Sequence, residues 1–229
     1  MLGRAGFYKV QMKLSILILT HNRPGLFIRA INSVLSILPE YDIEILVNND
    51  TKDIEEVYHN NVCIKYYYEQ KQDLSDIYKL LYDNATGEFI YFLEDDDYLK
   101  SNFFIGLDFK YDINYLEYMS EPLIQDIGPM CQFKRLTAAN RHLLNTTQLS
   151  CFLDKYDDRD FQLGQIIFKK KLISIFPTGN YICNDIELFK GLAGLDITIK
   201  YLLGQRWVQT TDGGDNISFN NLNKDDRFR

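Results

Sequence analysis

The sequence has no apolar run long enough to cross a bilayer, for which a helix needs about 20 consecutive apolar residues. Its four cysteines are widely separated and include no Cys-x-x-Cys pair, so their spacing indicates neither a disulfide framework nor a zinc site. Residues 1–11 lack the continuous apolar centre of a signal peptide, and we expect them to be an extension without a role in the fold. These absences favour a cytoplasmic protein with buried, reduced thiols.

Basic side chains are fewer than acidic ones, with 25 Lys and Arg against 32 Asp and Glu and a formal net charge of -7. This balance argues against broad nonspecific binding to nucleic acid or anionic membrane, because both require a basic surface. Hydrophobic residues make up 46% of the 229, which is enough to bury a sizeable core. The length fits one large domain, which we expect over residues 12–229.

An apolar run over residues 89–93 is followed by four consecutive carboxylates, Glu94, Asp95, Asp96 and Asp97. A strand interior does not tolerate such a cluster, because each buried anion would be desolvated without a partner. The cluster is therefore expected at the carboxyl end of a strand, which is where open parallel sheets bind ligands. Hard divalent cations take carboxylate oxygens, so a cation with a phosphorylated ligand is the simplest positive partner.

Short apolar runs alternate with segments of helical spacing through the first hundred residues. Strands are expected at residues 14–19, 43–47, 64–68 and 88–93, and helices at residues 24–38, 53–59 and 75–82. Strands that alternate with helices form right-handed crossovers, so the pattern predicts an α/β fold with a doubly wound, mostly parallel sheet.

The pattern is less regular beyond residue 100. Residues 102–109, 165–175 and 184–192 are compatible with helices, and residues 130–136 and 206–210 with strands. We expect this region to add a small mixed part beside the parallel sheet.

Two other predicted strands also end in polar residues, at residues 20–23 (Thr-His-Asn-Arg) and residues 49–50 (Asn-Asp). Together with the acidic cluster, these motifs resemble the nucleotide-binding half of a family 2 glycosyltransferase with the GT-A fold. The family's fourth strand has the form Gly-x-x-Ile-x-Phe-Leu-Asp-x-Asp-Asp, and residues 87–97 match it with Glu94 in place of the first Asp. The similarity is good over residues 14–100 and loose over residues 170–219.

The resemblance implies that residues 12–100 bind a nucleotide-sugar, with a UDP-sugar favoured, and that residues 101–229 bind the acceptor and carry the catalytic base. The implied donor-binding residues are Thr20, Asn22, Arg23, Asn49, Asp50 and Asp95, and the implied ligands of Mn²⁺ or Mg²⁺ are Glu94, Asp96 and Asp97. In this assignment Asp50 accepts a hydrogen bond from the base. The cation would neutralise the charge that develops on the diphosphate leaving group.

The resemblance also implies a base at the start of a late helix, for which Asp185 is the best match and Glu187 the substitute. Some relatives have a late His as a third metal ligand, but no His follows His142, which leaves Asp212 or Asp215 as candidates. The family's Ala-Arg-Asn segment, which contacts the diphosphate, has no counterpart near residues 75–79.

The function expected from the resemblance is metal-dependent, inverting sugar transfer to an acceptor hydroxyl, most simply on a saccharide of a surface polysaccharide or lipopolysaccharide. A second possibility is a virus-encoded enzyme that glycosylates hydroxymethyl-pyrimidines in DNA, with phosphate contacts from Lys169–Lys171, Arg135 and Arg141. A nucleotidyltransferase and a noncatalytic nucleotide-sugar-binding module are also compatible with these motifs. A dinucleotide-binding oxidoreductase is disfavoured, because residues 20–24 contain no glycine-rich loop.

Overall fold

The computed structural model describes residues 13–52, 54–70, 74–121, 163–174, 176, 188, 191–192 and 195–210, without the side chains of residues 117–121 and 209. Its principal elements are β1 (Lys13–Thr20), α1 (Pro24–Leu35), β2 (Asp42–Asn49), β3 (Cys63–Tyr67), α2 (Leu74–Asn84), β4 (Phe89–Glu94), β5 (Tyr98–Leu99), β6 (Ile113–Glu121), β7 (Ile166–Lys169) and β8 (Ile199–Thr210). Among the described residues no helix combines the length and apolar character needed to cross a membrane.

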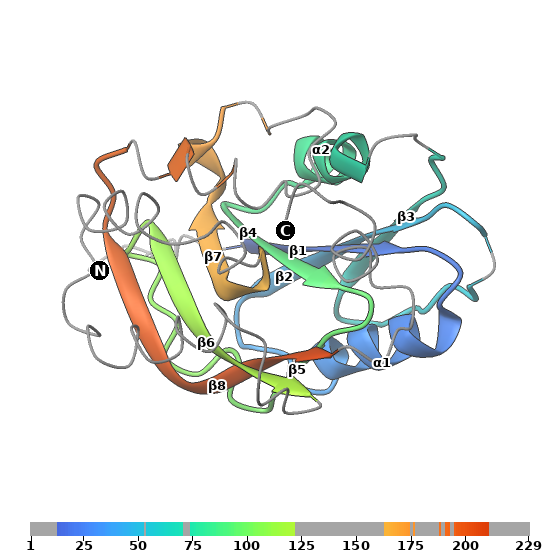
Figure 1. Cartoon of the computed structure of the whole chain (residues 1–229), viewed down its shortest axis with the longest axis horizontal. Coiled ribbons are helices and arrows are strands. Elements are labelled where there is room, and N and C mark those ends of the chain that lie inside the picture. Colours follow the sequence, from blue (N-terminus) through green and yellow to red (C-terminus); the bar gives the residue numbers. More distant parts are fainter. Residues whose placement is uncertain are drawn as a thin grey trace, which may run out of the picture.

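The described strands form one eight-stranded sheet in the order β3-β2-β1-β4-β7-β6-β8-β5 (Figure 1). The strands β3, β2, β1 and β4 are parallel, as predicted from their alternation with helices. Strand β7 lies antiparallel between β4 and β6, while β6 and β8 are parallel to each other. The sheet is therefore mixed but mostly parallel, and β7, β6 and β8 of its second half come from residues beyond 100.

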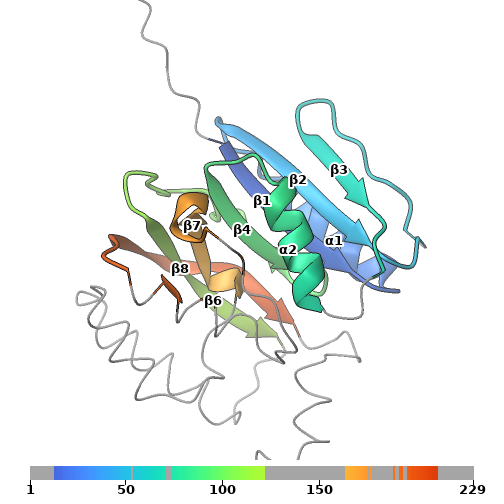
Figure 2. The ribbon, with the colours of Figure 1, turned by 90° about the horizontal axis from the view of Figure 1, so that it is seen from above.

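Helices α1 and α2 cover opposite faces of the sheet (Figure 2), which confirms the doubly wound arrangement. Along β1, Leu14, Ile16 and Ile18 pack in the core beneath α1, whereas Leu17 packs in the core beneath α2. Side chains alternate across a strand, so a strand buried on both faces must be apolar at every position. That requirement explains why β1 is apolar at every position from Ile16 to Leu19 and carries no charge between Lys13 and Thr20.

The register of the parallel strands brings three chain ends to one edge of the sheet. Thr20 at the end of β1 is opposite Asn49 at the end of β2, and Leu19 is opposite Glu94 at the end of β4. The three polar motifs of the sequence therefore share one edge, as expected for the carboxyl ends of parallel strands.

The opposite edge is held by a buried carboxylate, Glu44, which has no solvent exposure. It accepts hydrogen bonds from Ser15 Oγ (2.6 Å), Thr86 N (2.6 Å) and Gly87 N (3.1 Å), and Lys65 Nζ lies 3.0 Å away. A Cβ atom at Gly87 would lie only 2.5 Å from Ser15 Oγ and 2.6 Å from Ser15 N. Glycine at position 87 thus allows the start of β4 to approach β1.

Several expectations for local structure were wrong. The described residues from 54 to 58 form no helix, and residues 101–106 form turns rather than a helix. The segment expected as a helix over 165–175 contains β7 and a short 3-10 helix at Lys170–Leu172. An apolar run of four residues is compatible with a strand or a helix. Residues 166–169 form a strand because they pair with the edge of β4.

Of the remaining expectations, some are confirmed, one lies outside the described residues and one was wrong. The strand expected over residues 206–210 is confirmed as the end of the longer β8. Within the expected helix 184–192, the described residues 188, 191 and 192 are helical, while the strand expected over 130–136 lies outside the described residues. The expectation of buried thiols was wrong for Cys63, which is exposed where β3 begins at the sheet edge.

Candidate functional site

The acidic cluster, defined here as Glu94, Asp95, Asp96 and Asp97, lies at the turn that ends β4. The turn is closed by Asp97 N, which donates to Glu94 O at 3.1 Å, before the chain enters β5. One carboxylate oxygen each from Glu94, Asp96 and Asp97 lies within 4.8 Å of the others. The last three residues of the cluster are buried, so their charges lie close together with little solvent to screen them.

Arg23 joins the first sequence motif to the acidic cluster. Its Nη1 atom lies 3.2 Å from Asp95 Oδ1 and 3.3 Å from Asp96 Oδ2, and its side chain is 18% exposed. Arg23 immediately precedes α1, whose first residue, Pro24, suits a helix start. The helix start thus fixes where the guanidinium enters the cluster.

The pKa values of two cluster carboxyls show that their negative charge is incompletely compensated. Burial raises the pKa of Asp95, against the opposing effects of Arg23 and the Thr20 hydroxyl. Burial together with the charges of Glu94 and Asp96 raises the pKa of Asp97 well above its usual range, against the opposing effects of the Thr210 N–H and the Trp207 indole. A bound cation would relieve this repulsion.

Asp50, at the turn after β2, is contacted by His21 from the turn after β1. The Nδ1 atom of His21 lies 2.9 Å from both carboxylate oxygens, although the His21 side chain itself is 74% exposed. Asn22 has a φ of 50°, a left-handed conformation that Asn tolerates better than most residues, and its N–H donates to Thr51 Oγ1 at 3.3 Å. These contacts hold the first two motifs against each other.

Asn49 shapes the turn that carries Asp50. Its Oδ1 atom accepts hydrogen bonds from Lys52 N at 3.1 Å and Thr51 Oγ1 at 3.3 Å. Its Nδ2 atom is buried and has no hydrogen-bond partner among the described residues. Asn49 thus shapes the turn through its amide oxygen.

The acidic cluster fits a hard divalent cation. Mg²⁺ binds oxygen ligands at about 2.1 Å, so two ligands of one ion lie no more than about 4.2 Å apart. The separation of up to 4.8 Å among Glu94, Asp96 and Asp97 needs only a small side-chain adjustment to meet this limit. An all-carboxylate set suits Mg²⁺ or Mn²⁺ better than softer metals.

The other predicted residues of the catalytic half lie outside the described residues. These are the base candidates Asp185 and Glu187, the ligand candidates Asp212 and Asp215, and Arg135 and Arg141. The described part of β8 ends at Thr210, whose N–H donates to Asp97 Oδ1 at 2.9 Å. Strand β8 therefore ends beside the acidic cluster at Thr210, two positions before Asp212 in the sequence.

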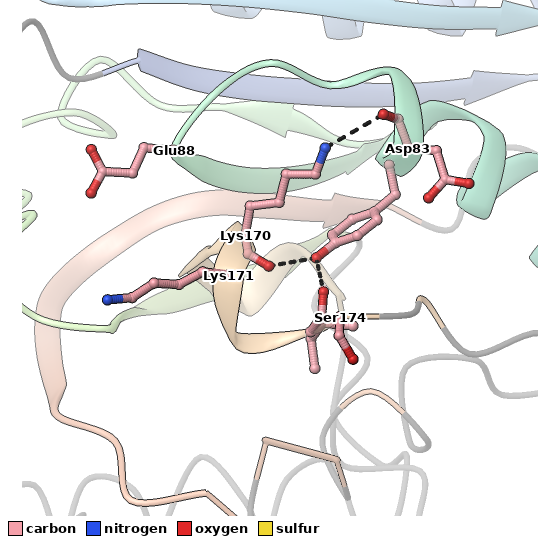
Figure 3. Close-up of a pocket in the computed structure, with 7 residues that line it drawn as sticks. Asp83, Glu88, Lys170, Lys171 and Ser174 are labelled. Carbon is pink, nitrogen blue, oxygen red and sulfur yellow. Dashed lines mark hydrogen bonds between the residues drawn. The ribbon is translucent and has the colours of Figure 1, made fainter.

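Lys169–Lys171, the candidate phosphate contacts, lie at the end of β7 and in the short 3-10 helix that follows it. Lys169 Nζ lies 2.9 Å from Asp112 Oδ1, and Lys170 Nζ donates to Ala85 O at 2.6 Å. Strand pairing places Lys169 opposite Phe89, at the start of β4 and away from the acidic cluster. An open hollow there is lined by residues of both charges, including Asp83, Glu88, Lys170 and Lys171 (Figure 3).

Sequence reasoning missed Arg29 and Thr210, which both contact the acidic cluster. Arg29 is the sixth residue of α1, where it resembles any charge on an amphipathic helix. Thr210 is an ordinary residue at the end of a strand. Neither carries a local signal, since their shared target is distant in the sequence.

Comparison with known proteins supports the motif assignment. Residues 15–107 match the family model described as Glycosyl transferase family 2, and this segment contains all three strand-end motifs. An uncharacterized protein, L64, of Acanthamoeba polyphaga mimivirus is 37% identical over 70 residues, which are 28% of this chain and 12% of that protein. That relative is therefore far longer than the matched segment.

Solved structures resemble the chain over most of its length. S. aureus TarS 1-349 in complex with UDP-GlcNAc has a TM-score of 0.59 and 17% identity, covering 90% of this chain and 61% of TarS 1-349. The mannosyltransferase PcManGT from Pyrobaculum calidifontis, in complex with GDP-Man and Mn²⁺, has a TM-score of 0.60 and 12% identity, covering 86% and 56%. The chain thus spans less than two thirds of either structure.

These likenesses and the sheet order agree with the expectation drawn from the strand-end motifs. The likeness to solved structures shows that the chain has the GT-A fold, and its residues 15–107 match the model of family 2 glycosyltransferases.

Proposed function

We propose that the chain is a metal-dependent glycosyltransferase that uses a nucleoside-diphosphate sugar, with a UDP-sugar favoured. The observation that carries the proposal is the buried acidic cluster at the same sheet edge as the ends of β1 and β2, within the family 2 region. The complexes of TarS with UDP-GlcNAc and of PcManGT with GDP-Man and Mn²⁺ support this class of donor and cofactor.

The donor's base and ribose are assigned to the edge formed by the first two motifs. Asp50 is the acceptor for a base N–H, and its contact with His21 holds the carboxylate in place while leaving lone pairs for a second donor. Thr20, Asn22 and the buried Nδ2 of Asn49 line the same edge. Asp95 is assigned to the ribose.

The diphosphate is assigned to the acidic cluster. Glu94, Asp96 and Asp97 would hold Mn²⁺ or Mg²⁺, which when bound neutralises charge on the departing nucleoside diphosphate. Arg23 holds Asp95 and Asp96 in fixed positions and adds a positive charge beside the phosphates. In this assignment, preorganised charges would face the charge that develops on the leaving group.

Inversion requires a base to take the proton of the acceptor hydroxyl, and we assign this role to Asp185 with Glu187 as the substitute. The acceptor we favour is a saccharide hydroxyl, on a surface polysaccharide or lipopolysaccharide. Lys169 and Lys170 are engaged by Asp112 and Ala85, which makes them poor phosphate contacts for a DNA acceptor.

The test is release of UDP or GDP from a panel of nucleotide-sugars with Mn²⁺, beside a parallel reaction containing EDTA. We expect slow donor hydrolysis with one donor, abolished by EDTA and accelerated by the right saccharide. Donor binding without hydrolysis or transfer would identify a noncatalytic binding module. Failure of every nucleotide-sugar to bind would overturn the proposal.

A further inference from the structure

Two residues from opposite parts of the chain meet behind the acidic cluster. Arg29 of α1 donates from Nη2 to Asp96 O at 2.5 Å and to Thr210 Oγ1 at 3.0 Å. The hydroxyl of Thr210 donates in turn to Asp96 O, and Thr210 N donates to Asp97 Oδ1 at 2.9 Å. Thr210 thus contacts two consecutive residues of the cluster at once.

We propose that Arg29 and Thr210 are positioning residues that set the geometry of Asp96 and Asp97 for cation binding. The inference rests on the proposed function, since it takes the acidic cluster as the cation site. Arg29 and Thr210 do not reach the donor or the cation in this scheme. They fix the backbone carbonyl of Asp96 and one carboxylate oxygen of Asp97, which determines where the remaining oxygens lie.

Burial makes these contacts effective. Thr210 is 2% exposed and Asp97 is fully buried, so water offers little competition for the hydrogen bonds. The Arg29 guanidinium also lies 5.3 Å from the centre of the Tyr98 ring, which keeps its plane beside the turn. A guanidinium held on three sides presents its donors in a fixed geometry, which a lysine does not reproduce.

Arg206 provides a matched comparison within the same strand. It is also largely buried and donates from Nη1 to the carbonyls of Asn102 (2.6 Å) and Ile105 (2.5 Å), but these residues lie outside the cluster. Loss of Arg206 should weaken the fold without changing cation affinity. Loss of the Arg29–Thr210 contacts should change cation affinity.

Trp207 supplies a readout that does not depend on activity. It is the single tryptophan of the chain, and its indole lies beside Asp97. Bound Mn²⁺ is paramagnetic, so titration with Mn²⁺ should quench Trp207 fluorescence and report the half-saturating concentration directly.

The experiment compares the wild-type chain with Thr210→Val, Thr210→Ser, Arg29→Lys and Arg206→Lys. Thr210→Val keeps the shape and the N–H to Asp97 but removes the hydroxyl, and Thr210→Ser restores it. We expect Thr210→Val and Arg29→Lys to raise the half-saturating Mn²⁺ concentration about tenfold, as loss of a buried hydrogen bond would. Thr210→Ser and Arg206→Lys should stay within about twofold of the wild type.

The outcomes separate the two proposals. If Mn²⁺ quenches the wild type but Thr210→Val and Arg29→Lys bind it equally well, the positioning role is wrong while the cation site stands. If all four variants lose affinity in parallel with their melting temperatures, the contacts are merely structural. If the wild type binds no Mn²⁺ with or without UDP, the metal assignment itself fails and the positioning role with it.

Discussion

At the scale of single residues, the acidic cluster depends on a small number of positive groups. Arg23 contacts two of its carboxylates, and the Arg29 guanidinium contacts the backbone of the cluster rather than a carboxylate. Burial raises the pKa of Asp95, and Arg23 offsets this effect only in part, while burial and the charges of Glu94 and Asp96 raise the pKa of Asp97. Substitutions in the cluster are therefore expected to change ligand binding far more than substitutions of other acidic residues.

The first prediction concerns the proposed metal ligands. Asp96→Asn should abolish Mn²⁺-dependent donor binding, weakening it by at least about 100-fold, because a neutral amide replaces a ligand charge. Isothermal titration with UDP and Mn²⁺ measures the effect. The same change at Asp42, an exposed residue at the start of β2, is the control and should leave binding unchanged. Equal losses in both variants would contradict the assignment.

The second prediction separates donor binding from catalysis. Asp185→Asn should retain UDP binding but lose sugar transfer by about 100-fold or more, as expected when a general base is removed. Initial transfer rates at saturating donor provide the measurement, with circular dichroism to verify the fold. Retained transfer in this variant, together with loss in Glu187→Gln, would move the base to position 187.

At the scale of strands and helices, Glu44 connects the parallel strands at the edge of the sheet opposite the acidic cluster. Burial alone would raise the pKa of Glu44, but hydrogen bonds from Ser15, Thr86 and Lys65 outweigh it and lower the pKa to about 2. These partners come from β1, β3 and the loop before β4, so one side chain connects three neighbouring elements to β2. Its ionisation should be visible in the stability of the whole sheet.

The third prediction is a pH dependence. A carboxyl with a pKa of about 2 in the folded state and 4.5 unfolded stabilises the fold fully above pH 4.5, and this contribution is lost as pH falls from 4.5 towards 2. The contribution is roughly 3 kcal/mol. Urea unfolding across this range should show a steeper loss of stability for the wild type than for Glu44→Gln. Parallel curves would show that another group is responsible.

The fourth prediction concerns the contact between β1 and β4. Gly87→Ala should destabilise the fold by about 3 kcal/mol, because the new methyl group would overlap backbone atoms of Ser15. Gly25→Ala is the matched control, since a Cβ at that position in α1 meets nothing within 4 Å and alanine favours a helix. The melting temperature should therefore fall for Gly87→Ala, and it should rise or stay unchanged for Gly25→Ala.

Strands β1 to β4 and helices α1 and α2 could be predicted because their signals are local. Strand β1 is apolar at nearly every position, Pro24 fits the start of α1, and Gly87 precedes β4. Strand β7 could not be predicted, because its four residues become a strand only by pairing with β4 and β6. The contact of Thr210 with Asp97 spans 113 positions, and no sequence pattern records such a distance.

At the scale of the whole molecule, charge decides which partners are plausible. The net charge is -7, and Lys169 and Lys170 make internal contacts in the described part of the chain. A DNA-modifying transferase would need a basic surface over several phosphates to hold its acceptor. The described surface around β7 offers no such stretch, which agrees with the preference for a saccharide acceptor.

The fifth prediction tests that preference. The chain should not be retained on double-stranded DNA in about 50 mM salt, measured by fluorescence anisotropy of a labelled duplex at about micromolar protein. The duplex should include hydroxymethylated pyrimidines, so that the modified base is sampled. Binding whose logarithm falls with the logarithm of salt, with a slope of several phosphates, would instead favour the DNA acceptor.

The antiparallel placement of β7 between β4 and β6 has a consequence for how the chain folds. Until residues 166–169 have been synthesised, the edge of β4 has unpaired backbone groups beside a completed run of β1, β2 and β3. The native pairing joins segments more than 70 positions apart, so its loop closure is slow compared with formation of the helices. A fragment that ends near residue 107 would keep an open strand edge, and we expect it to associate with other copies instead of remaining monomeric.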